Sequence, residues 1–257
     1  MKTNAFFLTV LMLLALTPGL WAQDAEAVIR ASRDRIKADT ISTRSKMVIS
    51  AKDGSTTERV LDQYSKDGPK GSRTMIVFQQ PATVAGTRFL TMENKGGEDD
   101  RWIYLPGLGK VRRVAASEGG GSFMGTDFSY DDISSMSRGV ELDTHTLLRE
   151  ETFGGSPCYV IQSVPKNSSY QYSKMIQWVG KDSKIITKIE LYDKKNALVK
   201  TVEMSGIKEV QGRLTATVTK ITTHAAGTST TITMDIVKYD ENIPERVFST
   251  SFLENGK

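Results

Sequence analysis

The stretch IITKIELY, residues 185–192, alternates between a more apolar and a more polar set of side chains. Successive side chains of a β-strand point to opposite faces of the sheet, so Ile189 and Leu191 share one face while Lys188 lies on the other. The stretch TITMDI, residues 231–236, repeats the pattern, with isoleucine and methionine alternating with threonine and aspartate. One apolar face and one polar face predict an antiparallel sheet that packs on a core with a single face.

Runs of strand-like sequence recur along the whole chain and are separated by turn residues such as Asp53-Gly54 and Gln211-Gly212. A spacing of about 8–12 residues with turn chemistry between the runs is typical of antiparallel all-β architectures. Neighbouring runs are expected to pair as hairpins. The strand-like runs cover residues 40–51, 57–66, 73–79, 87–93, 101–105, 110–114, 145–152, 157–164, 174–179, 184–192, 198–207, 214–223 and 230–239.

Few segments have a helical pattern that could cover such a sheet. They are an amphipathic run at 24–37, a short turn at 129–136 and a C-terminal segment at 244–252. The sequence therefore predicts a mainly β (α+β) fold, a single large curved antiparallel sheet with a few covering helices. A curved sheet with so little cover can enclose an apolar cavity.

The N-terminus is typical of a secretory signal peptide. Lys2 precedes an apolar run at 5–16, a Pro18-Gly19 break and a small residue at Ala22. An uncleaved membrane anchor is the alternative, but a spanning helix needs roughly 20 apolar residues and this run ends earlier. We expect residues 1–22 to be removed and residues 23–257 to form one domain in the periplasm. The single cysteine, Cys158, is far from the leader, so the mature chain is expected to be soluble and without a lipid anchor.

The composition argues against several classes of function. The 34 basic and 30 acidic residues are interspersed, which is unlike the clustered charge of a nucleic-acid-binding protein. With only His145 and His224 and no metal or nucleotide motif, we expect no enzyme activity, no metal and no cofactor. The glycine-rich run GGGSFMG, residues 119–125, departs from the dinucleotide-binding pattern at Met124.

The most distinctive segment is RWIYLPGLGKVRRVAASEGGGSFMGTDFSYDDI, residues 101–133. An ordinary hairpin with an aromatic face and solvated arginines would explain part of it. The glycine-rich loop, however, carries Phe123, Met124 and Phe128, and large apolar side chains in a loop usually bind or cover something. We therefore interpret this loop as a lid over the mouth of a cavity.

The order of motifs in this segment resembles the outer-membrane lipoprotein-sorting-protein family, the LolA-like periplasmic proteins. The matching parts are RWIYLP at 101–106, KVRR at 110–113, GTDFSYDD at 125–132 and GTRFL at 86–90. The resemblance implies an unclosed β-barrel of about 11 strands over an apolar cavity, covered by helices. It also implies a carrier of lipoprotein or lipid acyl chains toward the outer membrane, with an inner-membrane exporter or an outer-membrane receptor as protein partner.

Candidate site residues follow from this interpretation, and the alternation along the strands assigns them to faces. A slip of one residue would turn a side chain to the other face. Arg88, Arg101 and Arg112 are candidates for polar contacts at the lid. The predicted cavity lining is Met75, Phe78, Leu90, Met92, Trp102, Tyr104, Trp178, Ile189 and Leu191.

Two function classes remain open at this point. The first is a monomeric carrier that holds an acyl chain. The second is an envelope protein-interaction module, a stress sensor or an exporter adaptor, in which the same fold contacts a partner through Arg112-Arg113 and the loop.

Overall fold

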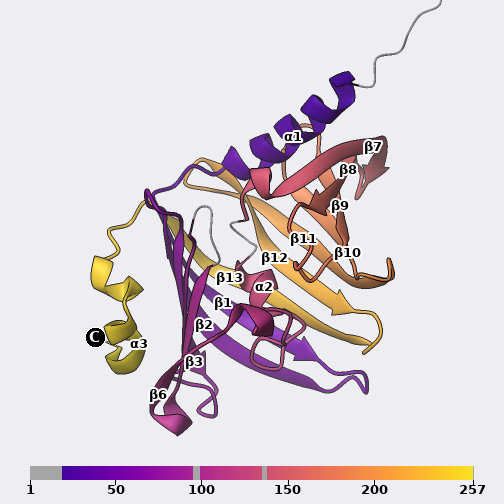
Figure 1. Cartoon of the computed structure of the whole chain (residues 1–257). Helices are drawn as coiled ribbons and strands as arrows, with labels where there is room; N and C mark the ends of the chain where they lie inside the picture. Colours follow the sequence, from indigo (N-terminus) through magenta and orange to yellow (C-terminus); the bar gives the residue numbers. More distant parts are fainter. Residues whose placement is uncertain (1–18, 95–98, 135–137, 257) are drawn as a thin grey trace, which may run out of the picture.

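A computed structural model of the chain describes residues 19–94, 99–134 and 138–256 (Figure 1). Within these ranges the strands form one antiparallel sheet, in the order β6-β5-β4-β3-β2-β1-β13-β12-β11-β10-β9-β8-β7. The strands are β1 (Thr40–Ser50), β2 (Thr56–Lys66), β3 (Arg73–Gln80), β4 (Arg88–Met92), β5 (Asp100–Leu105), β6 (Lys110–Arg113), β7 (Asp143–Phe153), β8 (Ser156–Pro165), β9 (Lys174–Gly180), β10 (Ile186–Tyr192), β11 (Leu198–Val210), β12 (Arg213–Thr223) and β13 (Thr228–Tyr239).

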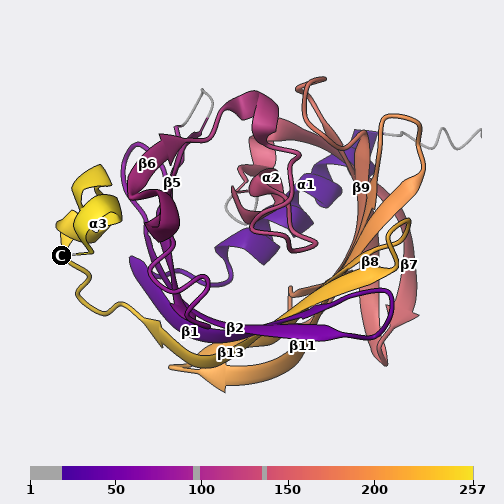
Figure 2. The ribbon, with the colours of Figure 1, turned by 90° about the horizontal axis from the view of Figure 1, so that it is seen from below.

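The sheet consists of two meanders that meet where the first strand pairs with the last. The β1–β13 pairing runs from Ile41 opposite Tyr239 to Ser50 opposite Ser229. The end strands β6 and β7 do not pair with each other, so the sheet curls without closing. Figure 2 shows this curl, with β6 and β7 on opposite sides of the concave space.

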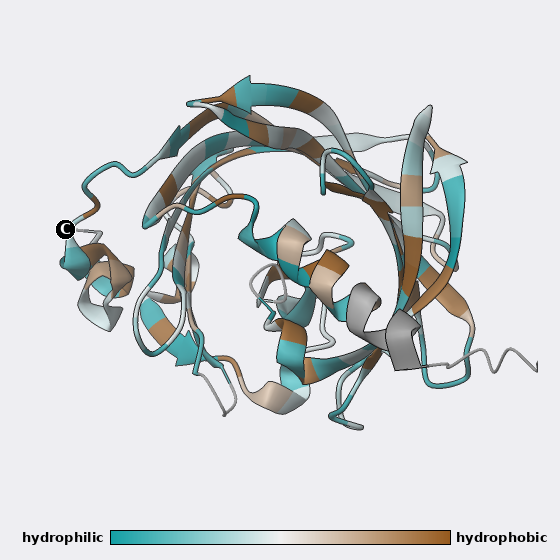
Figure 3. Cartoon of the chain, turned by 90° about the horizontal axis from the view of Figure 1, so that it is seen from above, coloured by the Kyte–Doolittle hydropathy of each residue, from teal (hydrophilic) through white to brown (hydrophobic). Residues whose placement is uncertain are grey.

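Three α-helices accompany the sheet in the described ranges, and they lie on different sides of it. Helix α1 (Gly19–Asp34) and the short α2 (Tyr130–Ser134) lie inside the curve, whereas α3 (Thr250–Asn255) lies outside it (Figure 3). The 3-10 helix η4 (Val140–Leu142) precedes β7, and η5 (Glu245–Phe248) precedes α3. The concave face is therefore filled from within, and one part of the convex face is covered by the C-terminus.

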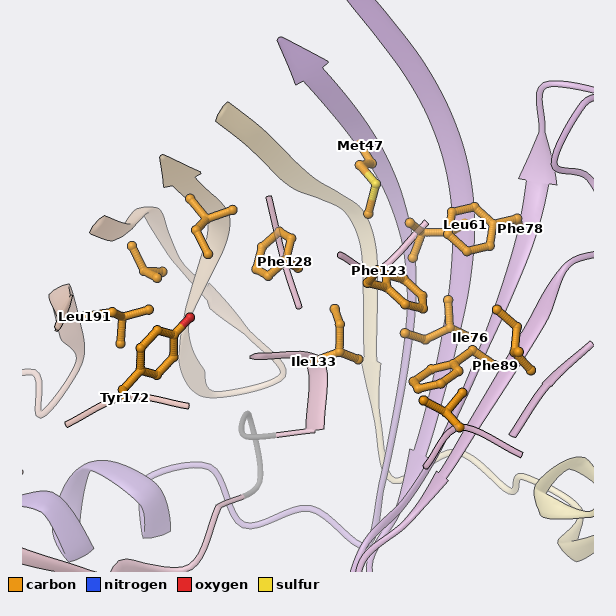
Figure 4. Close-up of a cluster of buried hydrophobic side chains, with 14 of the residues drawn as sticks. Met47, Leu61, Ile76, Phe78, Phe89, Phe123, Phe128, Ile133, Tyr172 and Leu191 are labelled. Carbon is orange, nitrogen blue, oxygen red and sulfur yellow. The ribbon is translucent and has the colours of Figure 1, made fainter. Parts of the chain in front are cut away.

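The main core lies on the concave face. Figure 4 shows Phe128 and Ile133 between two walls, with Leu191 and Tyr172 on one side and Phe78 among the side chains on the other. Fully buried aromatic side chains on both the sheet and the loop indicate packing at the density of a protein interior.

The curved antiparallel sheet with few helices is confirmed, and each of the thirteen strand-like runs is a strand. The resemblance implies about 11 strands, and the described residues form thirteen. The N-terminal helix begins at Gly19 and ends at Asp34, somewhat earlier than predicted. Residues 1–18 of the predicted signal peptide lie outside the described residues.

The alternation assigned Ile236 to the apolar face, and this is wrong. The β1–β13 register shifts so that Arg44 faces Ile236 while Ser45 faces Met234. Asp235 is therefore an extra residue, a β-bulge, which reverses the faces beyond it. Ile236 lies on the outer face and is 47% exposed.

Within the described ranges, no helix has both the length and the apolar character that crossing a bilayer requires.

Candidate ligand-binding cavity

The glycine-rich loop that was interpreted as a lid is instead packed into the concave core. Phe123 is fully buried, and Phe128 is 5% exposed. The ring of Phe123 lies 5.0 Å from that of Phe89 and 5.6 Å from that of Tyr130, centroid to centroid. Met124 is only partly buried and packs at the edge of the same cluster. The loop fills one half of the concave space, so Phe123 is a core residue, whereas Phe128 also borders a cavity; a lid role for Phe128 and Met124 remains a prediction.

Two carboxylates of the GTDFSYDD motif anchor this loop to distant strands. Asp127 accepts a hydrogen bond of 2.7 Å from the hydroxyl of Thr230 on β13, and the hydroxyl of Thr228 donates to it as well. Asp132 and Ser129 exchange hydrogen bonds between side chain and backbone, a reciprocal cap at the start of α2. The motif therefore fixes a loop inside the sheet.

Asp132 also connects the loop to the other wall. Its carboxylate accepts hydrogen bonds from Tyr172 Oη at 2.8 Å and from Lys200 Nζ at 2.7 Å. Burial and the neighbouring Asp132 raise the pKa of Tyr172 far above its usual value, so this phenol stays a neutral donor. A buried carboxylate with a lysine and a tyrosine as donors is satisfied without a bound ligand.

An apolar cavity of about 280 Å³ remains in the other half of the concave space, under α1. Helix α1 closes it from one side with Ile29, and Ile36, two residues after the end of the helix, borders the same side. The loop closes it from the opposite side through Phe128. The wall formed by the sheet consists of inward-facing side chains of β9–β12, including Met175, Ile189, Leu191, Val202, Met204 and Ile221.

Polar groups line the end of the cavity near η4. Arg138 pairs with the buried Asp143 at 2.7 Å, and its guanidinium lies 4.1 Å from the centre of the Tyr170 ring. His145 Nε2 lies 2.9 Å from the carbonyl oxygen of Val140, which can only accept, so this nitrogen carries the hydrogen. The hydroxyl oxygen of Ser163 lies 2.8 Å from Nδ1, within hydrogen-bond distance. Both ring nitrogens of His145 are therefore engaged in holding the wall together.

Three of the nine predicted lining residues face the concave side. Ile189 and Leu191 border the cavity. Phe78 is fully buried in the half that the loop fills, 6.0 Å from the ring of Phe123. Contact of these three with a ligand remains a prediction.

The other six predicted lining residues lie on the convex face, so their assignment to the inner face is wrong. Five of them pack on β3–β5 against η5 and α3, in a cluster with Phe248 and Leu253. The sixth packs with Phe153 on the outside of β7–β10. These six residues are Met75, Leu90, Met92, Trp102, Tyr104 and Trp178.

The three candidate arginines have three different surroundings. Arg88 donates to the carbonyl of Leu253 at 2.7 Å and holds the C-terminal helix to the convex face. Arg101 pairs with Asp131 at 2.7 Å next to the loop. Arg112 is half exposed and pairs with Glu118 at 2.7 Å. The structure does not bring the three arginines together: Arg88 lies on the convex face, whereas Arg101 and Arg112 flank the inner loop, next to Asp131 and Tyr130.

Several cavity residues were missed by the sequence reasoning. Val202, Met204 and Ile221 come from strands β11 and β12, which also carry many charged and threonine residues. The alternation of Val202 and Met204 with Glu203 is the signal that could have identified them. Tyr172 lies in the turn before β9, where no strand pattern assigns a face.

In the part of the chain that the structure describes, no three His, Cys, Asp or Glu side chains are grouped so that they could hold a metal ion.

Comparison with known proteins gives a consistent result. Residues 70–255 match the model of a family that is described as uncharacterized. The crystal structure of a DUF1329 family protein from Desulfovibrio piger superposes with a TM-score of 0.86, at 30% sequence identity over 91% of this chain and 99% of that one. The chain belongs to the DUF1329 family.

Two further crystal structures share the DUF1329 architecture. A proposed outer membrane lipoprotein-sorting protein domain from Vibrio parahaemolyticus is 26% identical over 91% of this chain and 99% of that one, with a TM-score of 0.85. A LolA superfamily protein from Nitrosomonas europaea is 18% identical over 89% and 99%, with a TM-score of 0.72, which shows the fold. The resemblance to the lipoprotein-sorting family and the unclosed LolA-like sheet are thereby confirmed. No curated protein matches the sequence.

Proposed function

We propose that the mature chain, residues 23–257, is a periplasmic carrier that holds an acyl chain of a lipoprotein or lipid in the cavity under α1 and moves it toward the outer membrane. The observation that carries this proposal is the cavity itself, enclosed by a helix, a pinned aromatic loop and a wall of aliphatic side chains. The likeness to a proposed lipoprotein-sorting domain supports it. The chain would act by burial and release, without catalysis.

The size of the cavity limits what it holds in this conformation. Its 280 Å³ lies at the lower edge of the roughly 300–1,000 Å³ typical of small-molecule sites. Each methylene removed from water contributes about 0.8 kcal/mol. An acyl chain too long for this volume could enter only if α1 moved outward. Such a movement would disturb the packing of Ala25 and Ile29 of α1 on the sheet. The amount of chain bound therefore depends on the position of α1.

A matched pair of variants tests the acyl site. Ile189→Glu places a carboxylate in the cavity wall, whereas Ile236→Glu places the same group on the exposed outer face. Titration with a fluorescent fatty acid should give saturable binding for the wild type and for Ile236→Glu and no binding for Ile189→Glu. Circular dichroism checks that both variants are folded. Full binding by a folded Ile189→Glu protein would contradict the assignment of this cavity.

An envelope protein-interaction module is the alternative function. The side chains of Arg112 and Arg113 are 50% and 69% exposed on the end strand β6, where a partner could reach them. Under this alternative the wild type would bind no acyl probe, and charge reversal at the two arginines would abolish capture of a partner from an envelope extract.

A further inference from the structure

The apolar cavity under α1 ends at Phe128, on the side opposite the helix. The Phe128 ring is 5% exposed and belongs both to the lining of the cavity and to the main core cluster. Phe123 of the same loop and Ile133 of α2, both buried, are members of that cluster. Figure 4 shows Phe128 between the two walls of the concave space. The ring therefore has the cavity on one side and packed core on the other.

Hydrogen bonds to β13 fix the backbone beside Phe128. The N–H of Asp127 donates to Oγ1 of Thr230 at 3.0 Å, and the Asp127 carboxylate accepts from the hydroxyls of Thr230 and Thr228. The carbonyl oxygen of Phe128 itself accepts from the N–H of Phe123 at 2.7 Å. An apolar chain end offers no hydrogen bonds to replace these, and leaving buried polar groups without partners is costly. The loop, and not the ligand, therefore sets the position of the ring.

The sheet wall of the cavity leads to the same anchor. In the β11–β12 pairing Met204 lies opposite Thr219, and Val202 lies opposite Ile221, two residues further along each strand. All four side chains line the cavity. On its other side Ile221 lies opposite Thr230, the residue that holds the loop. The wall therefore reaches the level of the loop anchor, and the cavity ends there.

The volume of the cavity limits how much of a lipid it can hold. An apolar cavity of about 150 Å³ holds one benzene molecule, which has six carbon atoms. By the same measure, 280 Å³ has room for roughly ten carbon atoms. This is the end of one acyl chain, and it leaves no room for a second chain.

We propose that the cavity recognises the end of a single straight acyl chain, roughly its last ten carbons, and that Phe128 is the end wall that sets this limit. While α1 keeps its position, the remaining carbons, the headgroup and any second chain of the lipid stay outside. This inference rests on the proposed acyl site and deepens it, because it names the part of the lipid that is bound and the residue that limits its length.

The test measures affinity as a function of chain length. The mature chain is titrated by isothermal calorimetry with saturated straight-chain fatty acids from hexanoate to hexadecanoate, each below its critical micelle concentration. Calorimetry gives the number of fatty acids bound per protein as well as the affinity.

Two variants change the length of the cavity in opposite directions. Phe128→Ala removes the ring of the end wall, and Val202→Phe adds a ring to the side wall. The matched controls are Phe123→Ala, in the same loop but outside the lining, and Val218→Phe, which lies next to the lining residue Thr219 and so faces outward. Circular dichroism checks that each variant is folded. Val202→Phe fills empty space, so it decides the test if Phe128→Ala does not fold.

In the wild type and both controls, the affinity should rise about fourfold with each methylene up to roughly ten carbons and stay level beyond, with one fatty acid per protein. In Phe128→Ala the rise should continue for roughly four to six further carbons, the size of the lost ring. In Val202→Phe the rise should stop roughly four carbons earlier than in the wild type.

Three results would overturn the inference. A rise that continues to hexadecanoate in the wild type, or two fatty acids bound per protein, would refute the limit and leave the acyl site standing. An unchanged limit in folded Phe128→Ala, or in Val202→Phe, would show that the length is set elsewhere. Binding of none of the fatty acids would refute the acyl site, and the inference with it.

Discussion

Replacing Phe123 by alanine tests whether the glycine-rich loop is part of the core. The ring is fully buried and lies 5.0 to 6.0 Å from the rings of Phe78, Phe89 and Tyr130, measured between centroids. Removing a buried phenylalanine costs about 3–5 kcal/mol of unfolding free energy, as lost transfer energy plus a cavity. For a chain of this size that corresponds to a drop of roughly 6–20 °C in melting temperature.

Urea denaturation followed by circular dichroism measures this loss. The dependence of the unfolding free energy on urea concentration should be the same in the variant and the wild type. The control is Leu108→Ala, whose side chain is 68% exposed and whose removal should change the free energy of unfolding by less than about 0.5 kcal/mol. A Phe123→Ala protein within about 0.5 kcal/mol of the wild type would refute the packing argument and restore the loop as a mobile lid.

Two further perturbations test the anchors of the fold. Asp132→Asn should lower the free energy of unfolding by roughly 3–5 kcal/mol, because it leaves the largely buried Lys200 without its counter-charge. Urea denaturation measures this loss, and the exposed Asp235→Asn is the control. An effect of Asp132→Asn no larger than that of the control would contradict the prediction. Arg73 and Lys66 lower the pKa of Glu245 to about 2, so the contribution of these ion pairs is complete above about pH 4.5 and is lost as the pH falls from 4.5 toward 2. Hydrogen exchange in the wild type should therefore show α3 and η5 losing protection over this pH range. In Glu245→Gln the protection of these two helices should be low at every pH. Equal protection in both proteins would contradict the role of Glu245.

The sheet could be predicted from the sequence because its signal is local. Each strand carries its own alternation and ends at turn residues, so thirteen runs could be located without knowing how they pair. Ile189 and Leu191 could also be assigned to the inner face, because the opposite face of β10 carries Lys188 and Glu190. Because one face of β10 is polar, the other face is the one expected to pack on the core.

The faces of β3–β5 could not be assigned in this way, because both are apolar. Ile76 and Phe89 pack on the inner loop, and Met75 and Leu90 pack under the C-terminal helix. The alternation shows that the two sets oppose each other but not which one faces inward. That choice is made by η5 and α3, which follow the end of β5 by 140 residues or more in the sequence.

The role of the family motif was also set by long-range contacts. Asp127, in the loop, and Asp132, in the short helix α2, have partners on distant strands, namely Thr230 on β13 and Lys200 on β11. Pairing of this kind follows from the strand order, in which β1 and β13 are neighbours.

Native mass spectrometry shows whether the cavity under α1 holds an acyl chain. Residues 23–257 are expressed in a bacterial periplasm, purified without detergent and examined by native mass spectrometry with lipid extraction. We expect a bound lipid mass in the wild type and in Ile236→Glu, and none in Ile189→Glu. An apo mass for all three proteins, unchanged after addition of phospholipid and lipopeptide, would contradict it.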